Sequence, residues 1–209
     1  MKVIGFVGSP RKDGNTDVLV QQVLNGVSAA GAETRIFYLN ELNIKGCQGC
    51  NACKVNDKCA LQDDMTALYD EIAEADGLVL GSPVYLSYLS GQTKCFLDRW
   101  YALLAADYTS KLKQGKKIVL VYAQANPDGE LYRQSFASLS EFLNCCGIEV
   151  LDTLVAAGVG EAGAVTNDDA FMKNARETGE RLVKVIKMAH VFKKPDAVSG
   201  PSKGKRNRT

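Results

Sequence analysis

The stretch VIGFVGSPRKDGNTDVLVQQVLNGVSAAG, residues 3–31, decides the fold. It opens with a continuous apolar run, Val3–Val7, which predicts a short strand buried on both faces. From Thr16 onward, apolar residues recur with the spacing of one helix face, and Gly31 follows as a helix-terminating residue. A buried strand that leads through a short polar loop into an amphipathic helix is the first half of a βαβ unit.

The same alternation continues along the chain. Further buried strands are predicted at residues 34–39, 78–80, 118–123 and 150–157, and helices at 65–75, 92–104, around 139–146, and 168–191. Five strands separated by helices predict an α/β fold with a doubly wound parallel sheet, of either the dinucleotide-binding or the flavodoxin type. Both types bind ligands beyond the carboxyl ends of the strands, so the candidate loops are 8–16, 40–62, 81–91, 124–129 and 158–167.

Composition predicts one domain, residues 1–192, in a chain of 209 residues with 46% hydrophobic content. The net charge of +1 gives no indication of a nucleic acid or an anionic membrane as partner, and no apolar run reaches the length of a membrane span. The apolar start breaks at Gly8 with no cleavage site after it, so we expect a strand, not a signal peptide, and a cytoplasmic protein. The basic segment 193–209 is expected to be a flexible, solvated tail.

The loop Gly8–Thr16 has the composition of a phosphate site. Backbone N–H groups at a helix N-terminus favour an anion, Ser9, Asn15 and Thr16 can donate hydrogen bonds, and Arg11 can pair with phosphate through two of them. The dinucleotide fingerprint G-x-G-x-x-G and the G-x-x-x-x-G-K-[ST] loop are both absent. The pattern therefore indicates a single terminal phosphate, as in FMN. An ordinary polar loop with a capping Asn or Thr is the alternative.

Four cysteines, Cys47, Cys50, Cys53 and Cys59, form the run C-x2-C-x2-C-x5-C in the long loop 40–62. Such spacing suits one iron–sulfur cluster, and neither a second run nor the proline of two-cluster ferredoxins is present. A zinc site and a metal-free dithiol remain open alternatives. No Ser-His-Asp or Cys-His pairing can be assembled, since the chain has one histidine, His190. Chemistry carried by cofactors is consistent with that absence.

Three motifs carry a resemblance to a known family. The strings G-S-P-R-x-x-x-N-T-x-x-L at Gly8–Leu19, G-S-P-V-Y at Gly81–Tyr85 and S-G-x-x-K-x-F-x-D-R at Ser90–Arg99 resemble the NADPH-dependent FMN reductase group of flavodoxin-like proteins. The cysteine run between them, followed by D-D-M at Asp63–Met65, resembles the iron–sulfur flavoprotein family. The resemblance covers roughly residues 1–160.

This resemblance implies a five-stranded sheet of order 2-1-3-4-5, FMN, and one [4Fe-4S] cluster on the four cysteines of the run. It also implies a homo-oligomer, dimer or tetramer, in which the cluster of one subunit lies near the flavin of another. Carried over by motif, the phosphate ligands would be Ser9, Pro10, Arg11, Asn15 and Thr16. The ribityl chain and ring would contact Pro83, Val84, Tyr85 and Tyr88. Relatives have a glycine-rich turn after the fourth strand, where this chain offers the side-chain amides of Gln124 or Asn126.

The sequence thus predicts a flavin-dependent oxidoreductase in which a ferredoxin-like donor, or NAD(P)H, supplies electrons that pass through cluster and flavin to an acceptor. A cluster-free NAD(P)H-dependent FMN or quinone reductase is the first alternative. A non-enzymatic flavodoxin-like electron carrier and a zinc-stabilised binding module without flavin are the others.

Overall fold

The computed structural model describes residues 1–192, and its centre is a parallel sheet with the order β2-β1-β3-β5-β6. The five parallel strands are β1 (Lys2–Val7), β2 (Glu33–Tyr38), β3 (Gly77–Tyr85), β5 (Lys116–Ala123) and β6 (Ile148–Ala156). Counted along the chain without the short β4 (Tyr88–Leu89), which pairs antiparallel with the end of β3, this is the predicted order 2-1-3-4-5. The flavodoxin-type sheet is therefore confirmed, with one added hairpin strand.

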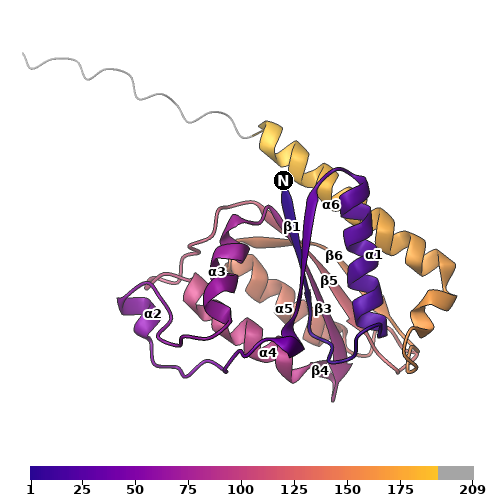
Figure 1. Cartoon of the computed structure of the whole chain (residues 1–209), viewed down its shortest axis with the longest axis horizontal. Coiled ribbons are helices and arrows are strands. Elements are labelled where there is room, and N and C mark those ends of the chain that lie inside the picture. The colour runs from indigo at the N-terminus through magenta and orange to yellow at the C-terminus, as the bar shows by residue number, and fades with distance from the viewer. Residues whose placement is uncertain (193–209) are drawn as a thin grey trace, which may run out of the picture.

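Helices cover both faces of the sheet. Figure 1 shows α1 (Asn15–Ala29) and α6 (Asp169–Phe192) on one face, and α3 (Met65–Glu74), α4 (Gly91–Asp98) and α5 (Arg133–Cys145) on the other. The one-turn helix α2 (Ala52–Val55) lies at the outer edge, beyond α3 (Figure 1). Short 3-10 turns occur at Leu39–Glu41, Arg99–Leu103 and Ala164–Asn167. No helix within the described range is long and apolar enough to cross a membrane.

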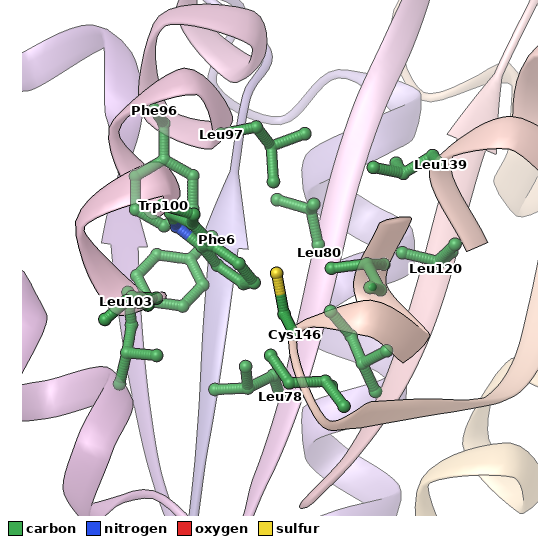
Figure 2. Close-up of a cluster of buried hydrophobic side chains, with 14 of the residues drawn as sticks. Phe6, Leu78, Leu80, Phe96, Leu97, Trp100, Leu103, Leu120, Leu139 and Cys146 are labelled. Atoms are coloured by element: carbon green, nitrogen blue, oxygen red, sulfur yellow. The ribbon is translucent and has the colours of Figure 1, made fainter. Parts of the chain in front are cut away.

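A hydrophobic core fills each face. Under α1 and α6 the two helix backbones approach so closely that a Cβ on Gly26 would lie 1.9 Å from the carbonyl oxygen of Arg176. On the other face an aromatic chain joins Phe6, Phe96 and Trp100, with ring centroids 4.7 and 5.4 Å apart. Figure 2 shows the thiol of Cys146 pointing into this cluster, and burial raises the pKa of that thiol to about 11.

Two element boundaries differ from the sequence prediction. Strand β3 does not end near Leu80 but continues to Tyr85, because Pro83 still pairs with the last residue of β5, Ala123, and so lies where the sheet interior ends. The strand then folds back through Leu86 and Ser87, both with positive φ, into β4. The helix expected over 92–104 is α-helical only from Gly91 to Asp98 and tightens to a 3-10 turn from Arg99 to Leu103.

Two cysteines outside the run also differ from expectation. Buried thiols were expected at Cys95, Cys145 and Cys146, but only Cys146 is buried, whereas Cys95 is half-buried and Cys145 is exposed. The predicted basic tail, residues 193–209, lies outside the described residues.

Candidate functional site

A cavity of ≈ 230 Å³ lies at the carboxyl ends of the strands, against the N-terminus of α1. The strand order reverses between β1 and β3, and ligands of open α/β sheets bind at such a switch point. One side of the cavity comes from the first loop and one from the end of β3, while small residues from the loops after β5 and β6 complete it. The lining residues are Ser9, Arg11, Gly14, Asn15, Thr16, Pro83, Val84, Tyr85, Ala123, Ala125, Val159, Gly160 and Ala162.

The first loop leaves helix α1 without a side-chain cap. Gly14 occupies the N-cap position, so the first N–H groups of the helix have no side-chain acceptor and can receive an anion. The loop is held by its own turns, with the Arg11 N–H donating to Ser9 Oγ at 3.1 Å and the Asp13 N–H donating to Asp17 at 2.9 Å. Thr16 is buried, and its hydroxyl makes no hydrogen bond within the described residues. These groups suit one phosphate.

Asn15 has a different role from the one that the sequence predicts. Its side-chain amide donates to the carbonyl oxygens of Val159 (3.1 Å) and Glu161 (2.7 Å), and its Oδ1 accepts the N–H of Val165 (3.0 Å). The side chain therefore fixes the loop after β6 against the start of α1. Its hydrogen-bonding capacity is used in this clamp, so a contact of Asn15 with phosphate must come from its backbone N–H.

A cluster of buried hydroxyls supports the first loop from below. Ser90, the N-cap of α4, donates to the Gly8 carbonyl at 2.6 Å and lies 2.8 Å from the Thr93 hydroxyl, which in turn donates to Ser82 at 3.2 Å. All three side chains are at most 1% exposed. A Cβ on Gly8 would lie 1.7 Å from Thr93 Oγ1, so this position requires glycine. The sequence analysis missed this cluster, although an N-cap serine before a helix was a visible signal.

The remaining predicted flavin ligands lie elsewhere. Pro10 is exposed and does not line the cavity, and Tyr88 lines a second cavity. Gln124 is buried, and its amide donates to the carbonyl oxygens of Asn126 (3.2 Å) and Asp128 (2.7 Å). Asn126 Oδ1 accepts the Asp128 N–H at 2.8 Å. These amides shape their own loop, and Ala125 lines the cavity in their place.

The second cavity is larger, ≈ 420 Å³, and lies between α4 and α5. It is lined by Cys47, Tyr88, Lys94, Leu97, Asp98, Tyr101, Ser138, Leu139 and Phe142. Its one lining cation, Lys94, is paired with Asp98 at 2.5 Å, and no helix begins at its wall without a cap. The cavity thus lacks the features of a phosphate site, but it adjoins both the cysteine loop and the β3–β4 hairpin.

The four cysteines of the run lie on one loop but are not gathered. Cys47 and Cys50 are exposed, Cys53 on α2 is buried, and Cys59 is half-buried. Among residues 1–192, no three metal-binding side chains stand close enough to hold an ion. The loop has the backbone freedom to rearrange around its thiols, with positive φ at Gly49, Asn51 and Asp57.

A buried ion pair closes the base of this loop. Arg99 Nη1 donates to Asp63 at 2.6 Å and to the Lys45 carbonyl at 2.9 Å, and Asp63 also accepts the Lys45 N–H at 3.1 Å. Both side chains are at most 1% exposed. Burial acts to raise the pKa of Asp63, but the hydrogen bonds from Arg99 and from the Lys45 and Met65 N–H groups outweigh it, so the pKa lies below its usual range.

Two lysines hold the other side of the loop. Lys54, on α2, donates to the carbonyl oxygens of Tyr101 (2.7 Å) and Leu104 (2.6 Å) and lies over the Tyr101 ring at 3.8 Å. Lys111 donates to the Asp57 carbonyl at 3.1 Å and pairs with its carboxylate at 2.9 Å. The cysteine loop is therefore fixed to the 3-10 turn after α4 and to the segment before β5, while its thiols remain near the surface.

The fold and the phosphate-type cavity define a flavodoxin-like, flavin-binding redox protein. The family model of NADPH-dependent FMN reductases matches residues 1–159. An iron-sulfur flavoprotein of Methanocaldococcus jannaschii is 37% identical over 194 residues, covering 90% of this chain and 98% of that protein. An iron-sulfur flavoprotein of Methanosarcina thermophila is 27% identical, covering 90% and 96%.

Solved structures agree with this fold. An NAD(P)H:quinone oxidoreductase from Methanothermobacter marburgensis superposes with a TM-score of 0.67 at 17% identity, covering 87% of this chain and 94% of that one. A flavodoxin from the domain Archaea gives a TM-score of 0.56 at 14% identity, covering 90% and 99%. The chain belongs to the NADPH-dependent FMN reductase family and, within it, to the iron–sulfur flavoproteins. It is an FMN-dependent oxidoreductase.

Proposed function

We propose that this oxidoreductase binds FMN in the cavity at the start of α1 and a [4Fe-4S] cluster on Cys47, Cys50, Cys53 and Cys59. In this function it accepts electrons from a ferredoxin-like donor or from NAD(P)H and delivers them to an acceptor. The observation that carries the proposal is the presence, on one chain, of an uncapped helix N-terminus in a cavity and a loop with four thiols.

FMN fits the residues of the first cavity. The uncapped N–H groups of α1, the Thr16 hydroxyl and the Arg11 guanidinium would hold the phosphate. Small side chains at Ala125 and Gly160 leave room for the ribityl chain. The ring would meet Tyr85, which is 43% exposed at the lip. Asn15 and the buried hydroxyls would act indirectly, by keeping the loops in place.

The cluster fits the chemistry of the donor set. Four thiols on one loop are the usual ligands of a [4Fe-4S] cluster, and the loop is anchored at its base and on one flank. Because the thiols are not gathered, binding would require the loop to close around the metal. The names of the relatives support the proposal, since three of them are iron-sulfur flavoproteins.

The two cofactors would supply complementary chemistry: FMN exchanges one or two electrons, and the cluster exchanges one. The chain itself binds the phosphate, orients the loops and excludes water from the buried side of the site. An assembly of two or four copies would bring the cysteine loop of one subunit near the flavin cavity of another, and this assembly is part of the proposal.

Purification without oxygen tests the proposal. We expect FMN and about four irons per subunit. Replacing Cys50 with Ala should abolish the iron and leave FMN largely bound, because the two cofactors use different loops. Cys145→Ala is the matched control, since Cys145 is exposed and lies outside the run, and it should retain both. Native protein with FMN but only background iron would contradict the cluster.

A second candidate is a cluster-free NAD(P)H-dependent FMN or quinone reductase. The separation of the four thiols and the family's NADPH dependence favour it. Rapid bleaching of the flavin by NADPH in iron-free Cys50→Ala protein, at the rate of the native protein, would support this candidate. Bleaching that requires the iron-loaded form would exclude it.

A further inference from the structure

Arg99 is buried with too few hydrogen-bond partners. A guanidinium carries five N–H donors, and Nη1 uses its two on Asp63 and the Lys45 carbonyl. Nε and Nη2 are buried and meet no acceptor within residues 1–192. Arginine stays charged when buried, so these donors cannot be removed by loss of a proton. The arrangement points to an anionic acceptor that the described residues do not supply.

The cysteine loop is the source of such an acceptor. Arg99 closes the base of the loop from Lys45 to Asp63, which contains all four cysteines of the run. The Tyr69 hydroxyl donates to the Arg99 carbonyl at 3.0 Å. Cys59 is near enough to contribute to the raised pKa of Tyr69, in which burial is the largest cause. Cys59 also contributes to the raised pKa of Arg99, in which burial opposes the Asp63 hydrogen bond.

We infer that Arg99 donates its Nε and Nη2 hydrogens to the sulfur atoms at the Cys59 corner of the bound cluster, and that this raises the reduction potential of the cluster. The inference rests on the proposed function. A thiolate-ligated cluster gains one negative charge on reduction, and N–H donors to its sulfurs, next to a fixed positive charge, stabilise the reduced form. Arg99 is thus a positioning and tuning residue, distinct from the cysteine ligands.

The rival explanation is a structural pin. In that case Nη1 only holds the two ends of the loop together, and Nε and Nη2 have no role. Replacing Arg99 alone cannot separate the two explanations, because it leaves the buried carboxylate of Asp63 unpaired and endangers the fold. A neutral background avoids this problem.

The test compares Asp63→Asn with Asp63→Asn/Arg99→Gln, in iron-loaded protein, by redox titration followed by electron paramagnetic resonance. Asp63→Asn removes a negative charge and should raise the cluster potential. The double variant should lower it, relative to Asp63→Asn, by at least a tenfold change in the reduction equilibrium constant, which is 59 mV for one electron. Asp63→Asn/Arg99→Lys, which keeps the charge but not the planar fork, should recover only part of that loss.

Each outcome decides the inference. Equal cluster potentials in Asp63→Asn and the Gln double variant would overturn it, and full recovery by lysine would overturn the hydrogen bonds. The FMN potential is the internal control and should not move. If the double variant fails to fold, as judged by thermal unfolding, an unchanged potential in Asp63→Asn would itself overturn the inference. Absence of iron from the native protein would instead overturn the proposed function.

Discussion

Replacing Asn15 with Ala should destabilise the apoprotein, because this side chain joins two segments that are about 150 residues apart in sequence (|i−j| 144 to 150). Asn15 is only 8% exposed and makes three hydrogen bonds to the backbone at Val159, Glu161 and Val165. At about 1 kcal/mol each, their loss lowers the free energy of unfolding by about 3 kcal/mol. For a domain of this size that corresponds to a fall of about 6–12 °C in the unfolding temperature.

The assay is thermal unfolding of FMN-free protein, with Thr16→Val as the matched control on the neighbouring residue. The Thr16 hydroxyl has no partner within the described residues, so this variant should keep the apoprotein stability. It should weaken FMN binding by about tenfold, the value of one hydrogen bond to a charged group of about 1.5 kcal/mol. If Asn15→Ala leaves the unfolding temperature unchanged and only weakens FMN binding, Asn15 is a phosphate ligand and the clamp is wrong.

Three further predictions follow from particular contacts. Gly8→Ala should cost about 1–3 kcal/mol by overpacking against Thr93 and should weaken FMN binding, while Thr93→Ala in the same protein should restore part of the stability in denaturant titrations. The folded-state pKa of Asp63 lies below its ordinary value of 3.8, so its contribution to stability is present above that value and lost as the pH falls through the folded pKa; acid unfolding of Asp63→Asn should lack this component. In mass-resolved alkylation of the folded protein near pH 8, Cys145 should react readily and buried Cys146, with a pKa of about 11, should not; equal rates would contradict the packing in Figure 2.

The β1–α1 unit could be predicted from the sequence because its signals are local. An apolar run, a polar loop and a helical stripe follow one another within residues 3–31, and the cavity forms where they meet. The order of the strands was not available from these signals, since two doubly wound types share them, and it came from the family resemblance. The β3–β4 hairpin was missed because Gly81-Ser82-Pro83 has the composition of a strand end.

Contacts between distant segments account for the rest. Nothing near Asn15 in the sequence indicates that its amide binds the backbone after β6. The motif D-R at Asp98–Arg99 was noted for its resemblance, but the pairing of Arg99 with Asp63 depends on how the turn after α4 meets the cysteine loop. Gln124 was predicted to face the flavin, and its binding of two nearby carbonyls reflects a loop conformation that side-chain chemistry alone does not determine.

The central claim is that the cavity at the start of α1 receives a single terminal phosphate. Titrating the apoprotein with FMN and with riboflavin, which differ only in that phosphate, tests it most directly. At least two charge-assisted hydrogen bonds of about 1.5 kcal/mol each predict FMN binding that is tighter by about a hundredfold or more, with an affinity that falls as salt is added. Equal affinity for the two flavins would contradict the account.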